Sequence, residues 1–195
     1  MSFQENLATG KVGESLIARY MMSRGHSVLP VYETEKSSGK GPQLFTRESG
    51  LVAPDMIIFT TNGAMFIEAK HKSVFTWHRS TSQWTTGIDL RHYDDYLRVA
   101  KRTHLPVWLM FYHREDSPSA NDISHGSPDK CPTGLFGGEL FKLSSNENHR
   151  SKPFCPNRSG FVGHGNSGMV YWSENALLKI ATKEEIIACQ IKEAT

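Results

Sequence analysis

Two apolar runs separated by three polar residues place the strongest constraint on how this sequence can fold. The runs span residues 55–60 and 64–70, and Thr61, Asn62 and Gly63 lie between them. Asn-Gly between such runs is the strongest short-range signal for a β-hairpin. The sequence therefore predicts two antiparallel strands joined by a two-residue Asn62-Gly63 turn.

The predicted register separates the charged side chains of this hairpin from its apolar ones. With Asn-Gly in the turn, Asp55 faces Lys70, and Glu68 faces Ile57. Directly opposed residues share one face of a sheet, and successive residues alternate between faces. Asp55, Glu68 and Lys70 therefore project from one face, at the end of the hairpin remote from its turn. The other face carries apolar residues suited to a core, which are Met56, Ile58, Met65, Ile67 and Ala69.

The two carboxylates of this face are candidate metal ligands. In the predicted register Asp55 and Glu68 occupy diagonal positions, roughly 7–8 Å apart at the backbone, so both can reach one ion between them. Carboxylate oxygens without a neighbouring cysteine suit Mg²⁺ or Mn²⁺ better than zinc. Such an ion polarises a phosphoryl oxygen, and Lys70 beside it would orient water or neutralise developing charge. The alternative interpretation is a surface salt-bridge cluster.

Composition bounds the class of protein. The chain has 195 residues, of which 38% are hydrophobic and 22% charged, as in one soluble globular domain rather than a disordered chain. No apolar run approaches the roughly 18 residues of a membrane span, and the first residues lack the pattern of a secretory signal. The three cysteines, Cys131, Cys155 and Cys189, show no CxxC spacing, which predicts a reducing cytoplasm rather than a disulfide framework.

Basic and aromatic residues interleave after the hairpin. The net charge is only +2, but residues 70–104 contain seven basic and three acidic side chains and five aromatic rings. This mixture suits a phosphate-rich partner whose bases stack, and the alternative is a solvated helix face with aromatic residues in the core. On the first interpretation the candidate nucleic-acid contacts are Lys72, Arg79 and Arg91 for phosphates, and Trp77 or Trp84 for bases.

The rest of the chain is expected to alternate helices, strands and loops. Hydrophobic periodicity predicts helices over residues 12–24, capped by Gly25, and 89–102, with a capping box at Thr182 and Glu185 inside a further helical stretch at 176–187. Strands are predicted at residues 27–32, 106–112, 138–143 and 169–172. Polar composition predicts loops or irregular ribbon at residues 33–50, 71–87 and 113–133. This order favours a mixed α/β sheet with helices packed on it.

The segments APDMIIF (53–59) and AMFIEAK (64–70) resemble the PD-(D/E)XK nuclease motif, with Asp55, Glu68 and Lys70 at the motif positions. The preceding GKVGESLIARYMMSRGHSV resembles the first helix of the Holliday-junction-resolvase-like branch, and the stretch after the motif is similar to phage or mobile-element members. The resemblance spans about residues 10–112. It implies an α/β fold with a mixed central sheet, in which an αβββαβ restriction-endonuclease-like core occupies residues 1–112. Residues 113–195 would form a loop-rich extension on the same domain.

The same resemblance implies a metal-dependent nuclease that hydrolyses phosphodiester bonds in DNA, with structure-selective, processing or restriction-like cleavage all open. Asp55, Glu68 and the backbone carbonyl of Ala69 would bind Mg²⁺ or Mn²⁺, and Lys70 would serve the attacking water. Glu14 matches an acidic residue of the first helix near the metal, although an ordinary exposed glutamate is the alternative. A homodimer and no membrane partner are expected.

Two other interpretations belong to different classes of function. One is a non-catalytic nucleic-acid-binding or scaffold module that retains the nuclease fold, and another is a member of the superfamily that cuts RNA. The complete set of two acids and a lysine argues against the non-catalytic module.

Cys131, His149, Cys155 and His164 are the residue types of a structural zinc site. Their long and irregular spacing, without a close ligand pair, makes zinc binding the weaker interpretation.

Overall fold

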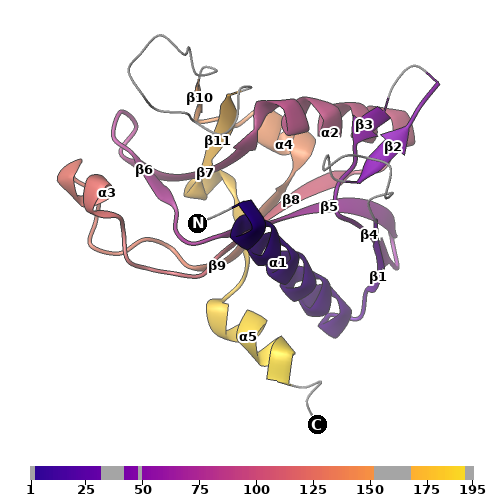
Figure 1. The fold of residues 1–195 in the computed structure, drawn as a ribbon, viewed down its shortest axis with the longest axis horizontal. Helices are drawn as coiled ribbons and strands as arrows, with labels where there is room; N and C mark the ends of the chain where they lie inside the picture. Colours follow the sequence, from indigo (N-terminus) through magenta and orange to yellow (C-terminus); the bar gives the residue numbers. More distant parts are fainter. Residues whose placement is uncertain (1–2, 32–41, 48–49, 152–167, 192–195) are drawn as a thin grey trace.

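The structure is a computed structural model, and it describes residues 3–31, 42–47, 50–151 and 168–191 (Figure 1). The helices are α1 (Phe3–Ser23), α2 (Leu90–Thr103), α3 (Ala120–Ser124), α4 (Leu140–Ser144) and α5 (Lys183–Ile191), with a 3-10 turn η1 at Glu174–Ala176. The strands are β1 (Ser27–Pro30), β2 (Gln43–Phe45), β3 (Gly50–Val52), β4 (Met56–Thr60), β5 (Gly63–Lys72), β6 (Thr76–His78), β7 (Gln83–Asp89), β8 (Val107–His113), β9 (Gly134–Glu139), β10 (His149–Ser151), β11 (Met169–Ser173) and β12 (Leu178–Ala181).

A six-stranded mixed sheet forms the centre of the molecule, with strand order β1-β4-β5-β8-β9-β12. Strands β5 and β8 run parallel, and each other neighbouring pair of this sheet is antiparallel. A second sheet has the order β10-β11-β7-β6, and β2 pairs with β3. The series α1, β1, β4, β5, α2, β8 follows the αβββαβ order, so the predicted fold class is confirmed.

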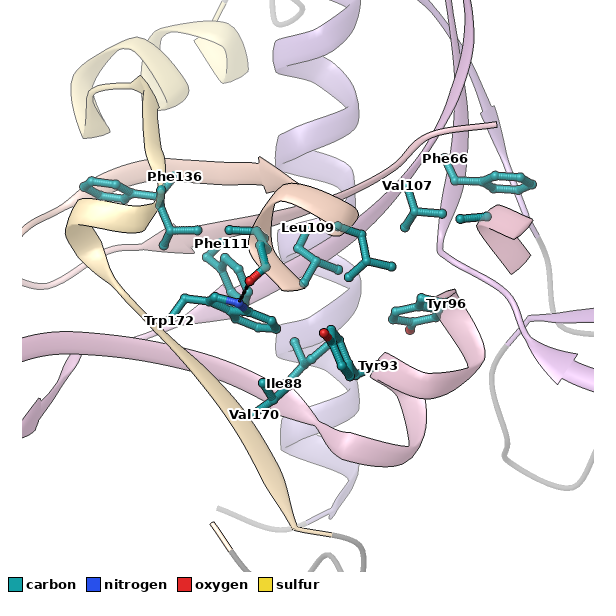
Figure 2. Close-up of a cluster of buried hydrophobic side chains, with 14 of the residues drawn as sticks. Phe66, Ile88, Tyr93, Tyr96, Val107, Leu109, Phe111, Phe136, Val170 and Trp172 are labelled. Carbon is teal, nitrogen blue, oxygen red and sulfur yellow. Dashed lines mark hydrogen bonds between the residues drawn. The ribbon is translucent and has the colours of Figure 1, made fainter. Parts of the chain in front are cut away.

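Two hydrophobic cores cover the two faces of the central sheet. On one face α1 packs Leu16, Ile17, Tyr20 and Met21 against the predicted apolar face of the hairpin. Figure 1 shows α1 crossing in front of the sheet. On the other face α2 and the second sheet pack against β5 and β8, and Figure 2 shows the rings of this core.

Helix α1 approaches β5 closely at one glycine. A Cβ atom on Gly13 would lie 2.4 Å from Cβ of His71, a distance that real Cβ atoms essentially never show. His71 points to the α1 face, as strand alternation predicts, and its ring stacks on Tyr112 with centroids 5.5 Å apart. The absence of a side chain at Gly13 therefore lets α1 lie directly on the strand that carries Glu68.

The β4–β5 hairpin forms, but its predicted register is wrong by two residues. Thr60 pairs with Gly63, so the turn consists of Thr61 and Asn62. Oγ1 of Thr60 accepts a hydrogen bond from the Asn62 amide and donates one to the Gly63 carbonyl, both 3.1 Å. Gly63 has φ of +127°, which glycine tolerates. A shift of two residues leaves every side chain on its predicted face, because faces alternate with a period of two.

Helices α1 and α2 confirm the first two predicted helices, and α1 begins earlier, at Phe3. Gly25 follows α1 with φ of +86°, as expected for a C-terminal cap. Three predicted loops are wrong in part. The 33–50 stretch contains β2, and 71–87 contains β6 and most of β7. The 113–133 stretch contains α3, which a Ser119–Asp122 capping box begins.

Two predictions near the C-terminus also need correction. Residues 140–143, predicted as strand, form α4 because the Glu139 carboxylate accepts hydrogen bonds from the amides of Phe141 and Lys142. Residues 178–181, within the predicted helical stretch, form β12 at the edge of the central sheet. The capping box is confirmed, since Thr182 and Glu185 exchange side-chain to backbone hydrogen bonds where α5 begins.

His113 is a buried titratable residue of the core between the sheets. It is 0% exposed, and its ring stacks on Phe75 with centroids 3.7 Å apart. Neither ring nitrogen has a hydrogen-bond partner within the described ranges. Burial, helped by the charge of Lys72, lowers the pKa of His113 from 6.5 to about 3. The ring is therefore neutral in the folded protein at neutral pH.

We predict that acid destabilises the protein partly through His113. The folded state binds the proton only near its lowered pKa, whereas the unfolded chain binds it near pH 6.5. The contribution of the neutral ring to the free energy of unfolding is therefore complete above that pH and declines as the pH falls towards 3. Urea unfolding at pH 7 and pH 5 should differ by on the order of 1–2 kcal/mol from this source.

His113→Phe removes the titration and fits the aromatic neighbours of the ring, so its stability should fall less between the two pH values. The matched control is His125→Gln, which changes an exposed imidazole after α3 and should respond to acid like the wild type. An equal response in His113→Phe and the wild type would contradict the buried, neutral state of the ring.

Candidate active site

The end of the β4–β5 hairpin remote from its turn carries the three charged residues on one face. Continued one residue beyond β4, the observed register places Asp55 directly opposite Glu68 instead of diagonal to it, which corrects the predicted spacing. Directly opposed Cβ atoms are roughly 4.5–5.5 Å apart. Oδ2 of Asp55 accepts a hydrogen bond of 2.8 Å from the Ala69 amide, which fixes the carboxylate against β5.

Glu68 is the most deeply buried acid of this group, with 1% of its surface exposed. Its Oε1 forms an ion pair with Nζ of Lys70, whose side chain is 30% exposed. Its Oε2 is buried and has no hydrogen-bond partner among the residues that the structure describes. An unpartnered carboxylate oxygen in the interior is costly, and it is the atom that a bound cation would satisfy.

Electrostatics also favour a cation beside these carboxylates. Burial, followed by the charge of Glu68, raises the pKa of Asp55 well above its ordinary value. Burial lowers the pKa of Lys70, but the charges of Glu68 and Asp55 outweigh it, so the pKa is raised overall. Lys70 is therefore an ammonium ion at neutral pH. One ammonium faces two carboxylates, which leaves room for further positive charge.

The donor set fits a hard divalent ion. Mg²⁺ is commonly held by one or two carboxylates and keeps several of its own waters, so two opposed carboxylates are sufficient. In the described part of the chain no three His, Cys, Asp or Glu side chains converge on one point. Asp55 and Glu68 are the two candidate side-chain ligands, and the Ala69 carbonyl is the candidate backbone ligand between Glu68 and Lys70.

The charge of Glu14 influences two residues of the site. Glu14 is half-buried on α1, next to the glycine that contacts His71. Its charge raises the pKa values of both Asp55 and Lys70. A role of Glu14 at the metal stays a prediction.

The three predicted phosphate contacts lie in different places. Lys72 continues the face of Glu68 and Lys70 along β5, and burial together with the Lys70 charge lowers its pKa to about 8. Arg91 is exposed in the first turn of α2. Arg79 is exposed in the turn between β6 and β7.

Two residues of α2 also belong to the surroundings of the site. Tyr96 is 2% exposed, and burial followed by the charges of Glu68 and Asp55 raises its pKa well above the ordinary value. His92 lies one turn earlier, and burial followed by the charge of Lys70 lowers its pKa. Sequence reasoning did not assign either residue, because nothing local indicates that α2 crosses over Glu68. Their spacing of four, which places both on one helix face, was the available signal.

The expected aromatic contacts with bases need correction. Trp84 is 9% exposed and belongs to the core, and Trp77 packs edge-to-face on it with ring centroids 5.0 Å apart. The two rings contact each other because β6 and β7 pair at these residues. Trp84 is therefore a core residue rather than an exposed stacking surface.

The candidate zinc ligands are only partly described. Cys131 is buried, and its thiol donates to the Glu115 carbonyl. His149 is stacked between the rings of His78 and Tyr171. Cys155 and His164 lie outside the described residues.

No protein-family model matches the chain, and no curated protein is significantly similar to it. Among solved structures, the chain is similar to Hjc, a Holliday junction resolvase of Archaeoglobus fulgidus, with a TM-score of 0.46 and 8% identity. The alignment covers 91% of this chain and 99% of that one. At this identity and TM-score the likeness does not bear on activity, which has to be inferred from this chain's own residues.

A search of the described helices for one that is both long and apolar enough to cross a membrane finds none.

We predict that Mn²⁺ stabilises the folded protein through Asp55. A ligand that binds only the folded state adds about 2.7 kcal/mol at a concentration 100 times its Kd. Thermal unfolding with and without Mn²⁺ should show this increase in the wild type and not in Asp55→Asn. Because protons compete with the ion for a carboxyl of raised pKa, the effect should grow as the pH rises.

Asp94→Asn is the matched control, since Asp94 is an exposed aspartate of α2. It should keep the full response to Mn²⁺. A response that survives in Asp55→Asn would place the ion elsewhere.

Proposed function

We propose that this chain is a metal-dependent nuclease that hydrolyses phosphodiester bonds in DNA. The observation that carries the proposal is the pair of opposed carboxylates beside a lysine on the same strand face, in which one buried oxygen of Glu68 has no hydrogen-bond partner among the described residues. A salt-bridge cluster on a surface would not need a carboxylate that is 1% exposed. The resemblance to the PD-(D/E)XK motif involves the same three residues.

Each residue of the site has a distinct proposed role. Asp55, Glu68 and the Ala69 carbonyl would hold Mg²⁺ or Mn²⁺, with Glu14 as a further acidic neighbour. When bound, the ion supplies a water of lowered pKa and polarises a phosphoryl oxygen. The Lys70 ammonium would orient the attacking water and neutralise charge that develops on the phosphate. Its ion pair with Glu68 keeps it at the carboxylates before substrate binds.

Basic side chains would bind the DNA backbone around this site. Lys72 extends the site along β5, Arg91 lies at the start of α2, and Arg79 lies in the β6–β7 turn. Contacts of this kind position the duplex without reading its sequence. The proposal includes structure-selective cleavage, a homodimer with two sites acting on two strands, and a cytoplasmic location in which the thiols of Cys131 and Cys189 stay free.

We predict that Lys70→Ala cleaves DNA about 100-fold to 1,000-fold more slowly than the wild type. This is the loss of rate typical when one electrostatic donor is removed from an active site. The variant should retain Mn²⁺ binding, because both carboxylates remain. The measurement is cleavage of single-stranded, duplex, flap and four-way-junction DNA, and of RNA, in Mg²⁺ or Mn²⁺. Lys142→Ala, an exposed lysine of α4, should cut like the wild type.

The assay separates the proposal from its alternatives. Cutting by Lys70→Ala at the wild-type rate would refute the role given to Lys70. Nucleic-acid binding without cutting of any substrate by the wild type would favour a non-catalytic module, and preferential cutting of RNA would identify an RNA-cutting enzyme.

A further inference from the structure

A groove of about 280 Å³ lies on the α1 face of the central sheet, between the end of α1 and β12. Its floor consists of Met65 from β5 and of Trp108 and Met110 from β8. The Tyr20 hydroxyl donates a hydrogen bond of 3.1 Å to the Ile180 carbonyl, which ties the α1 wall of the groove to its β12 wall. The groove is therefore shaped by tertiary structure rather than by a single loop.

Apolar side chains of this groove stay accessible in the described part of the chain. Leu178 lines the groove from the edge strand β12 and is 62% exposed. Met65 and Trp108 are only half-buried, although they pack against the core of the α1 face. Exposed apolar surface with a polar rim marks interaction sites, because burying it against a partner releases the water that covers it.

The residue types of the groove are those of protein interfaces. Aromatic residues, methionine and arginine are enriched at interface centres, and the residues that dominate binding energy are enriched in Trp, Tyr and Arg. The groove has Trp108, Tyr20 and Arg24, together with three methionines, whose flexible side chains adapt to a partner. Its volume lies just below the roughly 300–1,000 Å³ of small-molecule sites, so it suits one or two side chains of a polypeptide.

The rim of the groove is basic. Arg24 is exposed and His26 is half-buried, and both follow directly after the end of α1. Among the described residues that line the groove, none is acidic. A carboxylate next to a docked apolar side chain would meet Arg24, which forms strong paired hydrogen bonds with carboxylates. A nucleic-acid backbone would instead require a row of basic side chains rather than an apolar floor.

We propose that this groove docks an acidic segment of a partner protein, with a large apolar side chain on the floor and a carboxylate against Arg24. Met65 and Glu68 lie three residues apart on β5, so the groove and the candidate active site lie on opposite faces of the sheet. A docked segment therefore leaves the carboxylates of the site uncovered. This interaction goes beyond the proposed nuclease activity and does not depend on it.

The test measures binding of fluorescein-labelled peptides to the full chain by fluorescence anisotropy. Each peptide has an apolar pair, which is Leu-Phe, Leu-Trp or Ile-Met, between two aspartates on either side. One matched set replaces the aspartates by lysines, and another replaces the apolar pair by serines. The acidic apolar peptides should bind at least about 10-fold more tightly than either matched set, because both the floor and the rim contribute.

Two variants at exposed positions locate the binding site. Arg24→Glu should reverse the preference, so that the lysine peptides bind more tightly than the aspartate peptides. Leu178→Glu should weaken binding of the acidic apolar peptides by about 10-fold or more, since it places a charge at the apolar wall. Arg98→Glu, which changes an exposed arginine of α2, is the matched control and should bind like the wild type. Circular dichroism should show all three variants folded.

Several outcomes would overturn the proposal. Absence of peptide binding, equal binding of aspartate and lysine peptides, or wild-type binding by both Arg24→Glu and Leu178→Glu would each do so. Binding of phenylacetate without binding of any peptide would assign the groove to a small carboxylate instead. A dimer in sedimentation velocity that Leu178→Glu dissociates would assign it to a second copy of the chain.

Discussion

The carboxylate of Glu68 is the constraint on which the rest of the site depends. Glu68 belongs to β5, an inner strand of the central sheet, and only 1% of its surface is exposed to solvent. A buried charge of this kind persists only with compensating partners. Lys70 supplies an opposite charge at Oε1, yet Oε2 has no hydrogen-bond partner within the part of the chain that the structure describes. The structure thus tolerates a local cost at the one place where a cation would remove it.

The fold around Glu68 explains how this arrangement is held. Strand β5 lies between β4 and β8, so backbone hydrogen bonds fix it on both sides. Asp55 is tied to β5 by the Ala69 amide, and the close contact at Gly13 presses α1 onto the other face. Helix α2 packs against the sheet on the face opposite α1, which is the face that carries the site residues. Carboxylates supported in this way need little rearrangement to receive an ion, which is the condition for precise catalysis.

The sheet face on which each site residue lies could be predicted from the sequence. That prediction needs only the alternation of successive side chains between the two faces of a strand. The Asn62-Gly63 signal gave a turn one residue too late, yet Asp55, Glu68 and Lys70 still share a face because the register error is two residues. Distances were less predictable, since they depend on the register itself. The pairing of β7 with β11 could not be foreseen, because these strands are far apart in sequence and join only in the tertiary structure. The influence of the site charges on Tyr96 and His92 has the same origin, since it follows from the path of α2 and not from local pattern.

The most direct measurement of the central claim is a crystal structure of the protein grown with Mn²⁺, with anomalous diffraction recorded near the manganese edge. We predict an anomalous peak between Asp55 and Glu68, with Oε2 of Glu68 among the coordinating atoms at the short distances of carboxylate oxygens to a hard divalent ion. A fully ordered site at saturating Mn²⁺ without a peak there, with Oε2 still unpartnered, would contradict the claim that these carboxylates form a metal site.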